Sequence, residues 1–154
     1  MNKLPDLLAQ LAVTLWVGGM WAIGYLAAPV LFDALSDKML AGALAGRMFA
    51  LMAYIGMVSG VYLLVFRLAR FGGAAFKQGF WWLVVLMLLL TIAGHFGISP
   101  ILVALKEQAL PLDVMHSVFK DRFVTWHGVS SVLYLVQSLL GVFLVMSNRG
   151  GGSK

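Results

Sequence analysis

The sequence predicts an all-α integral membrane protein built as a four-transmembrane-helix bundle. Of its 154 residues, 62 % are hydrophobic and 11 % are charged, whereas a soluble domain has about 45–50 % apolar and about 25 % charged residues. The mean hydropathy of +0.95 is equally high. A chain of this size has too few polar side chains to cover so much apolar surface, so lipid is the expected solvent. The composition therefore excludes a cytosolic enzyme, and the lack of cysteine excludes a disulfide-bonded secreted domain.

Four apolar stretches come close to or exceed the roughly 20 residues that a helix needs to cross a bilayer. They cover approximately residues 7–31, 48–66, 79–101 and 127–146. The first stretch is longer than the apolar region of about 7–15 residues in a cleaved signal peptide, so we expect it to remain as a membrane helix. Residues 1–149 are predicted to form a single domain, and residues 150–154 a flexible tail.

Capping residues predict where the second and fourth helices begin. Ser36 is the expected N-cap of the second helix, with Asp37 in its first turn. Pro111 suits the first position of the fourth helix. The second helix would then cover about residues 37–67 and the fourth about 112–147. At about 1.5 Å per residue, both would exceed the roughly 30 Å hydrocarbon core, so helices 2 and 4 are expected to extend beyond the membrane.

The charged residues predict that the N- and C-termini are cytoplasmic. With four spans, the termini and the central loop share one side of the membrane, which holds six basic residues and one acidic residue. The other side holds five of each. Lys and Arg are enriched in cytoplasmic loops, which assigns the first side to the cytoplasm. Its basic residues are Lys3, Arg67, Arg70, Lys77, Arg149 and Lys154.

The two predicted hairpins resemble each other in sequence. Pro29-Val30-Leu31 recurs as Pro100-Ile101-Leu102, at an offset of 71 residues. Residues 56–63 recur without gaps as residues 128–135, at an offset of 72. These matches predict two duplicated helical hairpins, related as parallel repeats about an axis along the membrane normal. Chance similarity in a restricted alphabet is the alternative.

Polar residues at helical spacing mark one face of the fourth span and suggest a ligand site. Because polar groups are costly in lipid, this face and a weaker one on the first span are expected to point into the bundle. The first-span residues are Gln10, Thr14, Gly18, Trp21 and Tyr25. Two interpretations stay open: hydrogen bonds that join helices, or a cleft lined for a ligand. The candidate ligand-binding residues are His127, Ser130, Ser131, Tyr134, Gln137, His95, Arg122, Trp16 and Tyr25.

The histidines are candidate metal or haem ligands. His95 and His127 could meet across the third and fourth helices, and imidazole suits Cu, Zn and haem iron. His116, expected on the protruding part of the fourth helix, is about 16 Å from His127 along a straight helix and could not share a metal with it. Met48, Met52 and Met115 are candidate additional ligands. The alternative is a structural or proton-linked histidine bonded to a neighbouring hydroxyl or carbonyl.

Glycine pairs predict close helix packing. Gly42 and Gly46, and likewise Gly56 and Gly60, fit the small-xxx-small spacing that lets membrane helices approach. The sequence does not specify their partners.

No enzyme signature is present, so we expect a non-catalytic protein. The chain has no HExxH or GxSxG motif and no pair of intramembrane carboxylates. Two serines and a histidine on one helix make no catalytic triad without an acid to orient the imidazole.

The start of the fourth span resembles a known family. Phe123 is followed by Trp126-His127-Gly128 and by Ser130-Ser131, and this run is similar to one in small bacterial membrane proteins of unknown function related to eukaryotic transmembrane protein 205. Tyr134 stands where some relatives have Asn. The resemblance implies an uncharacterised multi-pass protein of the bacterial inner membrane. Resistance to platinum drugs in the eukaryotic members, and a first span similar to copper-resistance membrane proteins, imply metal handling.

Two functions are compatible with these observations. The first is binding or permeation of a small molecule or metal ion between the helical hairpins. The second is an accessory or scaffold subunit of a larger membrane complex, in which the polar face serves packing alone. The expected partners are the lipid bilayer and a second copy or larger complex. Nucleic acid is not expected, because no basic cluster exceeds three residues.

Overall fold

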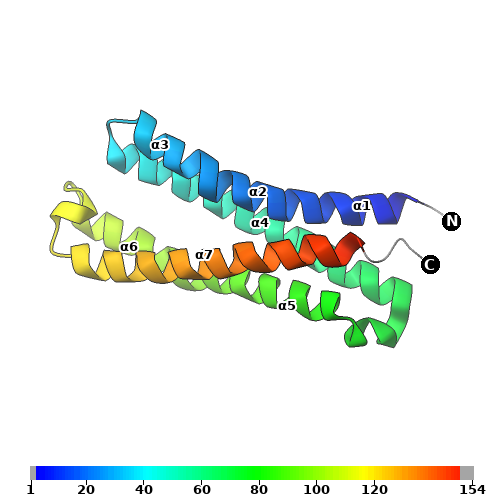
Figure 1. Cartoon of the computed structure of the whole chain (residues 1–154). Helices are drawn as coiled ribbons and strands as arrows, with labels where there is room; N and C mark the ends of the chain where they lie inside the picture. Colours follow the sequence, from blue (N-terminus) through cyan, green and yellow to red (C-terminus); the bar gives the residue numbers. More distant parts are fainter. Residues whose placement is uncertain (1–2, 150–154) are drawn as a thin grey trace.

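The computed structural model describes residues 3–149 and forms an antiparallel bundle of four long helices (Figure 1). The predicted tail at residues 150–154 lies outside the described residues. The first long helix contains α1, α2 and α3, which are joined by π-helical turns at Thr14–Gly18 and Ala22–Ala27. The second is α4 and the fourth is α7. The third contains α5 and α6, joined by a π-helical turn at Ala93–Ile98. The bounds are α1 Leu4–Val13, α2 Gly19–Trp21, α3 Ala28–Ala34, α4 Lys38–Phe71, α5 Gly79–Ile92, α6 Ser99–Ala109 and α7 Lys120–Arg149.

All four long helices are long and apolar enough to cross a membrane. They contain the four predicted apolar stretches, so the chain is a multi-pass membrane protein whose outer surface contacts lipid. At one end, here called the terminal end, α1 begins, α7 ends and α4 turns into α5 (Figure 1). The opposite end, called the distal end, holds the connections at residues 35–37 and 110–119. The two hairpins diverge toward the distal end (Figure 1).

The second helix begins one residue later than predicted, because Asp37 and not Ser36 is its N-cap. The Asp37 carboxylate accepts hydrogen bonds from the backbone N–H groups of Met39 at 2.9 Å and Leu40 at 3.0 Å. Asp37 has an extended backbone, which places its carboxylate over the first free N–H groups of the helix.

The fourth helix begins at Lys120, so the prediction of a start near residue 112 was wrong. Asp113 instead caps a short 3-10 turn at Val114–His116, with its carboxylate 2.7 Å from the N–H of Met115. Ser117 Oγ then donates to the carbonyl of Val114 at 2.8 Å and accepts from the N–H of Phe119 at 3.1 Å. These local side-chain bonds compete with helical ones. His116 therefore lies in a turn and not on the fourth helix.

The helix lengths do not divide into two long and two short helices. The first and third helices each run continuously over 31 residues, and α7 has 30. Because the first and third helices continue to Ala34 and Ala109, they reach the distal end together with α4 and α7.

The core is built around Trp16, whose side chain is only 1 % exposed. Its indole lies against Gly56 and Gly60 of α4: a Cβ atom at Gly56 would lie 2.5 Å from Trp16 Nε1, and one at Gly60 would lie 3.1 Å from the ring. The predicted close packing at this glycine pair is confirmed. Gly46 differs, since a Cβ atom there would meet nothing within 4 Å.

Two of the π-helical turns lie just before a proline. Ala22–Ala27 precedes Pro29, and Ala93–Ile98 precedes Pro100. Proline lacks an N–H and its ring crowds the carbonyl four residues earlier, so a wider turn relieves the clash and keeps the helix continuous.

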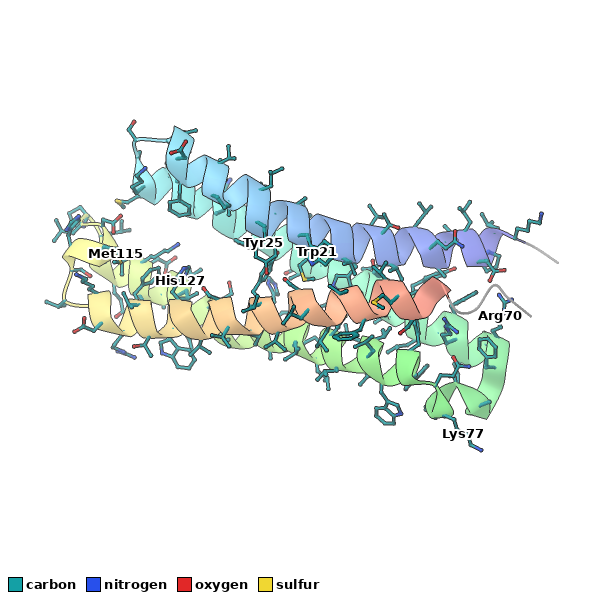
Figure 2. All side chains as sticks on the ribbon, viewed as in Figure 1. Trp21, Tyr25, Arg70, Lys77, Met115 and His127 are labelled. Atoms are coloured by element: carbon teal, nitrogen blue, oxygen red, sulfur yellow. The ribbon has the colours of Figure 1, made fainter. Side chains whose placement is uncertain are left out.

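The terminal end holds Arg67, Arg70 and Lys77, three of the basic residues that predicted the orientation. Arg70 forms an ion pair with Asp6 of α1. Arg67 donates to the Gln78 side chain at 3.2 Å and its guanidinium carbon lies 4.0 Å from the centre of the Phe80 ring. The α4–α5 turn is therefore fastened to the bundle, while Lys77 is exposed there (Figure 2).

Candidate functional site

The polar face of α7 is fully engaged in its middle part. Gln137 and Ser138 are buried, as is Thr91 of α5. Gln137 Nε2 lies 2.5 Å from Thr91 Oγ1, and Trp21 Nε1 donates to the Ser138 carbonyl at 3.3 Å. Ser138 Oγ donates back to the carbonyl of Tyr134 at 2.8 Å. Here the polar residues join helices, as the first of the two interpretations expects.

Tyr134 joins three helices one turn closer to the distal end. Its hydroxyl donates to the carbonyl of Met20, and its ring lies on Gly24, where a Cβ atom would overlap the ring. The ring meets those of Phe49 and Tyr25 edge-on, with centroids 5.3 Å and 6.1 Å away. Tyr25 points from the first helix toward α7 (Figure 2). Tyr134 thereby fills the seam between the hairpins at mid-height.

The rest of the α7 face lies on the distal side of Tyr134. His127 is exposed, and its ring stacks on Phe123 with centroids 5.6 Å apart. Ser131 Oγ donates to the His127 carbonyl at 2.9 Å, within the same helix. His127 projects on the side of α7 that faces the first hairpin (Figure 2). These groups therefore keep hydrogen-bonding capacity that the middle of α7 has already used.

Lys106 of α6 also reaches this region, although the sequence analysis did not select it. Its Nζ lies 5.6 Å from the centre of the Phe123 ring, within the range of a cation–π interaction. A Cβ atom at Gly42 of α4 would lie 3.4 Å from the same Nζ. The ammonium group thus lies between α4 and α7. The name distal cluster is used below for Tyr25, Phe49, Lys106, Phe123, His127 and Tyr134.

His95 contacts a different set of residues. Its half-buried ring lies edge-on to Tyr54 of α4, with centroids 4.8 Å apart, and next to Phe96 at 4.7 Å. His127 has Phe123 as its aromatic neighbour. Within residues 3–149, no three His, Asp or Glu side chains cluster closely enough to hold a metal ion. The two histidines thus have different aromatic neighbours in the structure.

Some residues from the predicted site lie elsewhere. Trp16 is in the core, and Met52 is buried under Gly19. Arg122 is exposed on α7, and at 3.6 residues per turn it is rotated by about 120° from the face shared by His127 and Tyr134. The structure therefore gathers only part of the predicted set.

The prediction that the whole polar face of the first helix points inward was wrong. Gln10, Thr14 and Gly18 are exposed. Thr14 Oγ1 donates to the Gln10 carbonyl at 2.9 Å, so its hydroxyl is satisfied within the helix and can face outward. The first helix buries the opposite face, made of Ala9, Ala12, Val13, Trp16, Val17 and Met20.

The fold and these contacts define a four-helix multi-pass membrane protein with a polar and aromatic seam between two hairpins. The chain belongs to the family described as Domain of unknown function (DUF4149), whose model matches residues 11–111. The matched part contains Trp16, Tyr25 and His95 and ends before α7 begins. No curated protein and no solved structure matches the chain.

Proposed function

We propose that this protein is a non-catalytic membrane protein that binds a small molecule or metal ion between its helical hairpins, at the distal cluster. The supporting observation is a change along one face of α7. Gln137 and Ser138 are buried and bonded to other helices, whereas Ser131 bonds only within α7 and His127 is exposed. Polar groups on an inward face that are not used for packing are available to a ligand.

Tyr134 favours binding over permeation. On its terminal side the seam is closed by buried apolar side chains, among them Met20 and Leu144. On its distal side lie the exposed rings of Tyr25 and His127. A ligand that enters from the distal end would stop at the Tyr134 ring, and passage would require that ring to leave Gly24.

The chemistry of the distal cluster suits two kinds of ligand. Tyr25 and Tyr134 offer aromatic faces, and Lys106 offers a cation, which together fit an apolar molecule with an acidic or carbonyl group. His127 offers an imidazole to Cu or Zn, whose remaining ligands would come from water or the bound molecule. The same reasoning gives haem iron a single axial ligand at His127 or His95.

We further propose the finer relationships that the sequence suggests: kinship with eukaryotic transmembrane protein 205, duplication of one hairpin, and a bacterial inner-membrane location with cytoplasmic termini. The duplication gains support from the π-helical turns Ala22–Ala27 and Ala93–Ile98, which are offset by 71 residues, like Pro29 and Pro100. Labelling of single cysteines introduced at Gly73 and Val118 in intact cells tests the orientation, since only the cysteine at position 118 should react with an impermeant reagent.

The scaffold role is the second candidate, supported by the packing function of Gln137 and Thr91. Metal and haem analysis of the natively purified protein, followed by titration with Cu(I), Zn(II) and haem in detergent, separates the two. We expect wild type to bind one of these probes and His127→Gln to lose it, while His116→Gln, which removes an exposed histidine from the distal loop, binds like wild type. Identical binding by His127→Gln, or no bound probe together with a co-purifying partner, would favour the scaffold.

A further inference from the structure

The connection between α4 and α5 carries three basic residues at the terminal end of the bundle. Arg67 and Arg70 lie in the last turns of α4, and Lys77 ends the 3-10 turn Gly72–Lys77. Arg70 and Lys77 are exposed at this end (Figure 2), and Arg67 is half-buried. The name basic turn is used below for Arg67, Arg70 and Lys77. It lies at the opposite end of the bundle from the distal cluster.

The basic turn has a net positive charge. Among the described side chains, Asp6 is the one carboxylate that lies within 4 Å of a basic nitrogen, and it pairs with Arg70. The other five acidic side chains of the chain all lie in the distal half: Asp33, Asp37, Glu107, Asp113 and Asp121. Three cations against one carboxylate leave two positive charges here. Because residues three apart on a helix are neighbours, Arg67 and Arg70 reinforce one another's field.

The sequence around the basic turn places it at the height of the lipid headgroups. Arg67 directly follows the apolar stretch 48–66, and the next apolar stretch begins at Gly79, so the chain leaves and re-enters the hydrocarbon core on either side of the turn. The rings of Phe71, Phe76 and Trp82 are exposed in the same segment, and aromatic rings are typical of the membrane interface. Long basic side chains beside an apolar span extend into the headgroup layer.

Contacts within the turn hold its backbone in one shape. Trp82 Nε1 donates to the Phe76 carbonyl at 2.9 Å, and the N–H of Gln78 donates to the Ala75 carbonyl at 3.0 Å. Ala75 is fully buried, and the Arg67 guanidinium is held at the Gln78 side chain. A partner that binds to this surface therefore has little backbone to order, which lowers the entropic cost of binding.

We propose that the basic turn binds the headgroup of an anionic phospholipid. Guanidinium and ammonium groups donate charge-assisted hydrogen bonds to phosphate oxygens. The uncompensated positive charge favours a headgroup with a net negative charge over a zwitterionic one, whose own cation it repels. The exposed rings at the same height favour a lipid over a soluble anion, because they can pack against its glycerol and upper acyl carbons. The site does not depend on the function proposed for the distal cluster.

Native mass spectrometry of the full chain in detergent tests this site. The protein is incubated with equal amounts of phosphatidylglycerol and phosphatidylcholine of the same acyl chains, and we expect wild type to retain phosphatidylglycerol preferentially. Lys77→Gln should lower that preference about fivefold. Asp6→Asn releases Arg70 from its ion pair and should raise the preference by a similar factor. Lys120→Gln is the matched control, because it removes the same charge at the distal end, and it should keep the wild-type preference.

A second experiment separates a lipid from a soluble anion as the occupant. Inorganic phosphate is added in large excess at an ionic strength that ammonium acetate keeps constant. We expect the bound phosphatidylglycerol to stay on the protein, because phosphate offers nothing to the aromatic rings beside the basic turn.

Three results would overturn the proposal. The first is equal retention of the two lipids by wild type. The second is a loss in Lys120→Gln as large as that in Lys77→Gln, which would indicate diffuse attraction by the net charge of the chain. The third is displacement of the lipid by inorganic phosphate, which would assign the basic turn to a soluble anion. Asp6, Lys77 and Lys120 all lie at the surface, so their replacement leaves the buried packing intact, and the opposite shifts expected for Asp6→Asn and Lys77→Gln cannot both come from misfolding.

Discussion

The terminal and distal halves of the bundle, which meet at Tyr134, are held together differently. In the terminal half, Trp16 lies against Gly56 and Gly60, and Gln137 is bonded across to α5. In the distal half the hairpins diverge (Figure 1), and contacts between them are made by aromatic rings and the Lys106 ammonium. The polar residues on one continuous face of α7 thus bond to other helices in the terminal half and stay accessible in the distal half. Polar spacing on a membrane helix consequently has to be interpreted turn by turn.

Gly56→Ala should disrupt the packing of the terminal half and cause the largest loss of stability. The new methyl group would overlap the rigid, buried indole of Trp16, and overpacking of this kind costs about 1–3 kcal/mol or more. We expect a loss of about 3 kcal/mol in the free energy of unfolding, measured by denaturation in mixed micelles. Gly46→Ala on the same helix is the control: its methyl group would meet nothing within 4 Å, so it should keep stability or raise it by up to about 1 kcal/mol. Equal effects of the two variants would refute the assigned packing.

Gly24→Ala should disrupt the boundary between the halves. The methyl group would overlap the Tyr134 ring, which would have to leave the seam, so we expect a loss of about 1–3 kcal/mol. The double variant Gly24→Ala/Tyr134→Ala removes the clash, and its Gly24 substitution should therefore cost little relative to Tyr134→Ala alone. Thermal unfolding of the four proteins measures this coupling. Additive effects would show that Tyr134 does not occupy this site.

Gln137→Leu should destabilise the terminal half by a smaller amount. It removes the bond to Thr91, and interhelical hydrogen bonds of this kind contribute about 0.6 kcal/mol on average. Thr91 keeps its own bond to the Met87 carbonyl at 2.9 Å, so no polar group is left without a partner. A double-mutant cycle with Thr91→Val should give a coupling energy of about 0.6 kcal/mol. A coupling near zero would mean that the buried pair contributes no adhesion.

His127→Gln should have the smallest effect on stability. The side chain is exposed in the distal half, so we expect a change within about 0.5 kcal/mol, with unaltered helical content by circular dichroism. A loss near that of Gly24→Ala would make His127 a packing residue and remove the contrast between the halves.

The membrane spans could be predicted because apolar length is a local property of the sequence. Close packing at Gly56 and Gly60 could also be predicted from spacing alone, but spacing also selected Gly46, where an added Cβ atom would meet nothing within 4 Å. The contact between a glycine and its partner depends on residues far away in the chain, such as Trp16. Contacts between residues this far apart in the chain leave no periodic pattern in the sequence from which they could be predicted.

The site was predicted less well than the fold for the same reason. The Tyr134 hydroxyl and the Met20 carbonyl are 114 residues apart, and Gly24 carries no signal of its own. The prediction that Thr14 points into the bundle was wrong, because a hydroxyl that donates a hydrogen bond within its own helix can face lipid. The start of α7 was missed because the bonds of Asp113 and Ser117 outweigh the helical preference of Pro111.

The π-helical turns at Ala22–Ala27 and Ala93–Ile98 also determine where this chain can change in length. A π turn holds one residue more than the α turn it replaces. Deleting a single residue there lets the helix close an ordinary turn while the faces on either side keep their orientation. In an α-helical part of a span, the same deletion rotates every following side chain by about 100° and carries lipid-facing residues into the core. Each of these two turns is thus a position at which evolution can shorten its helix without remodelling the bundle.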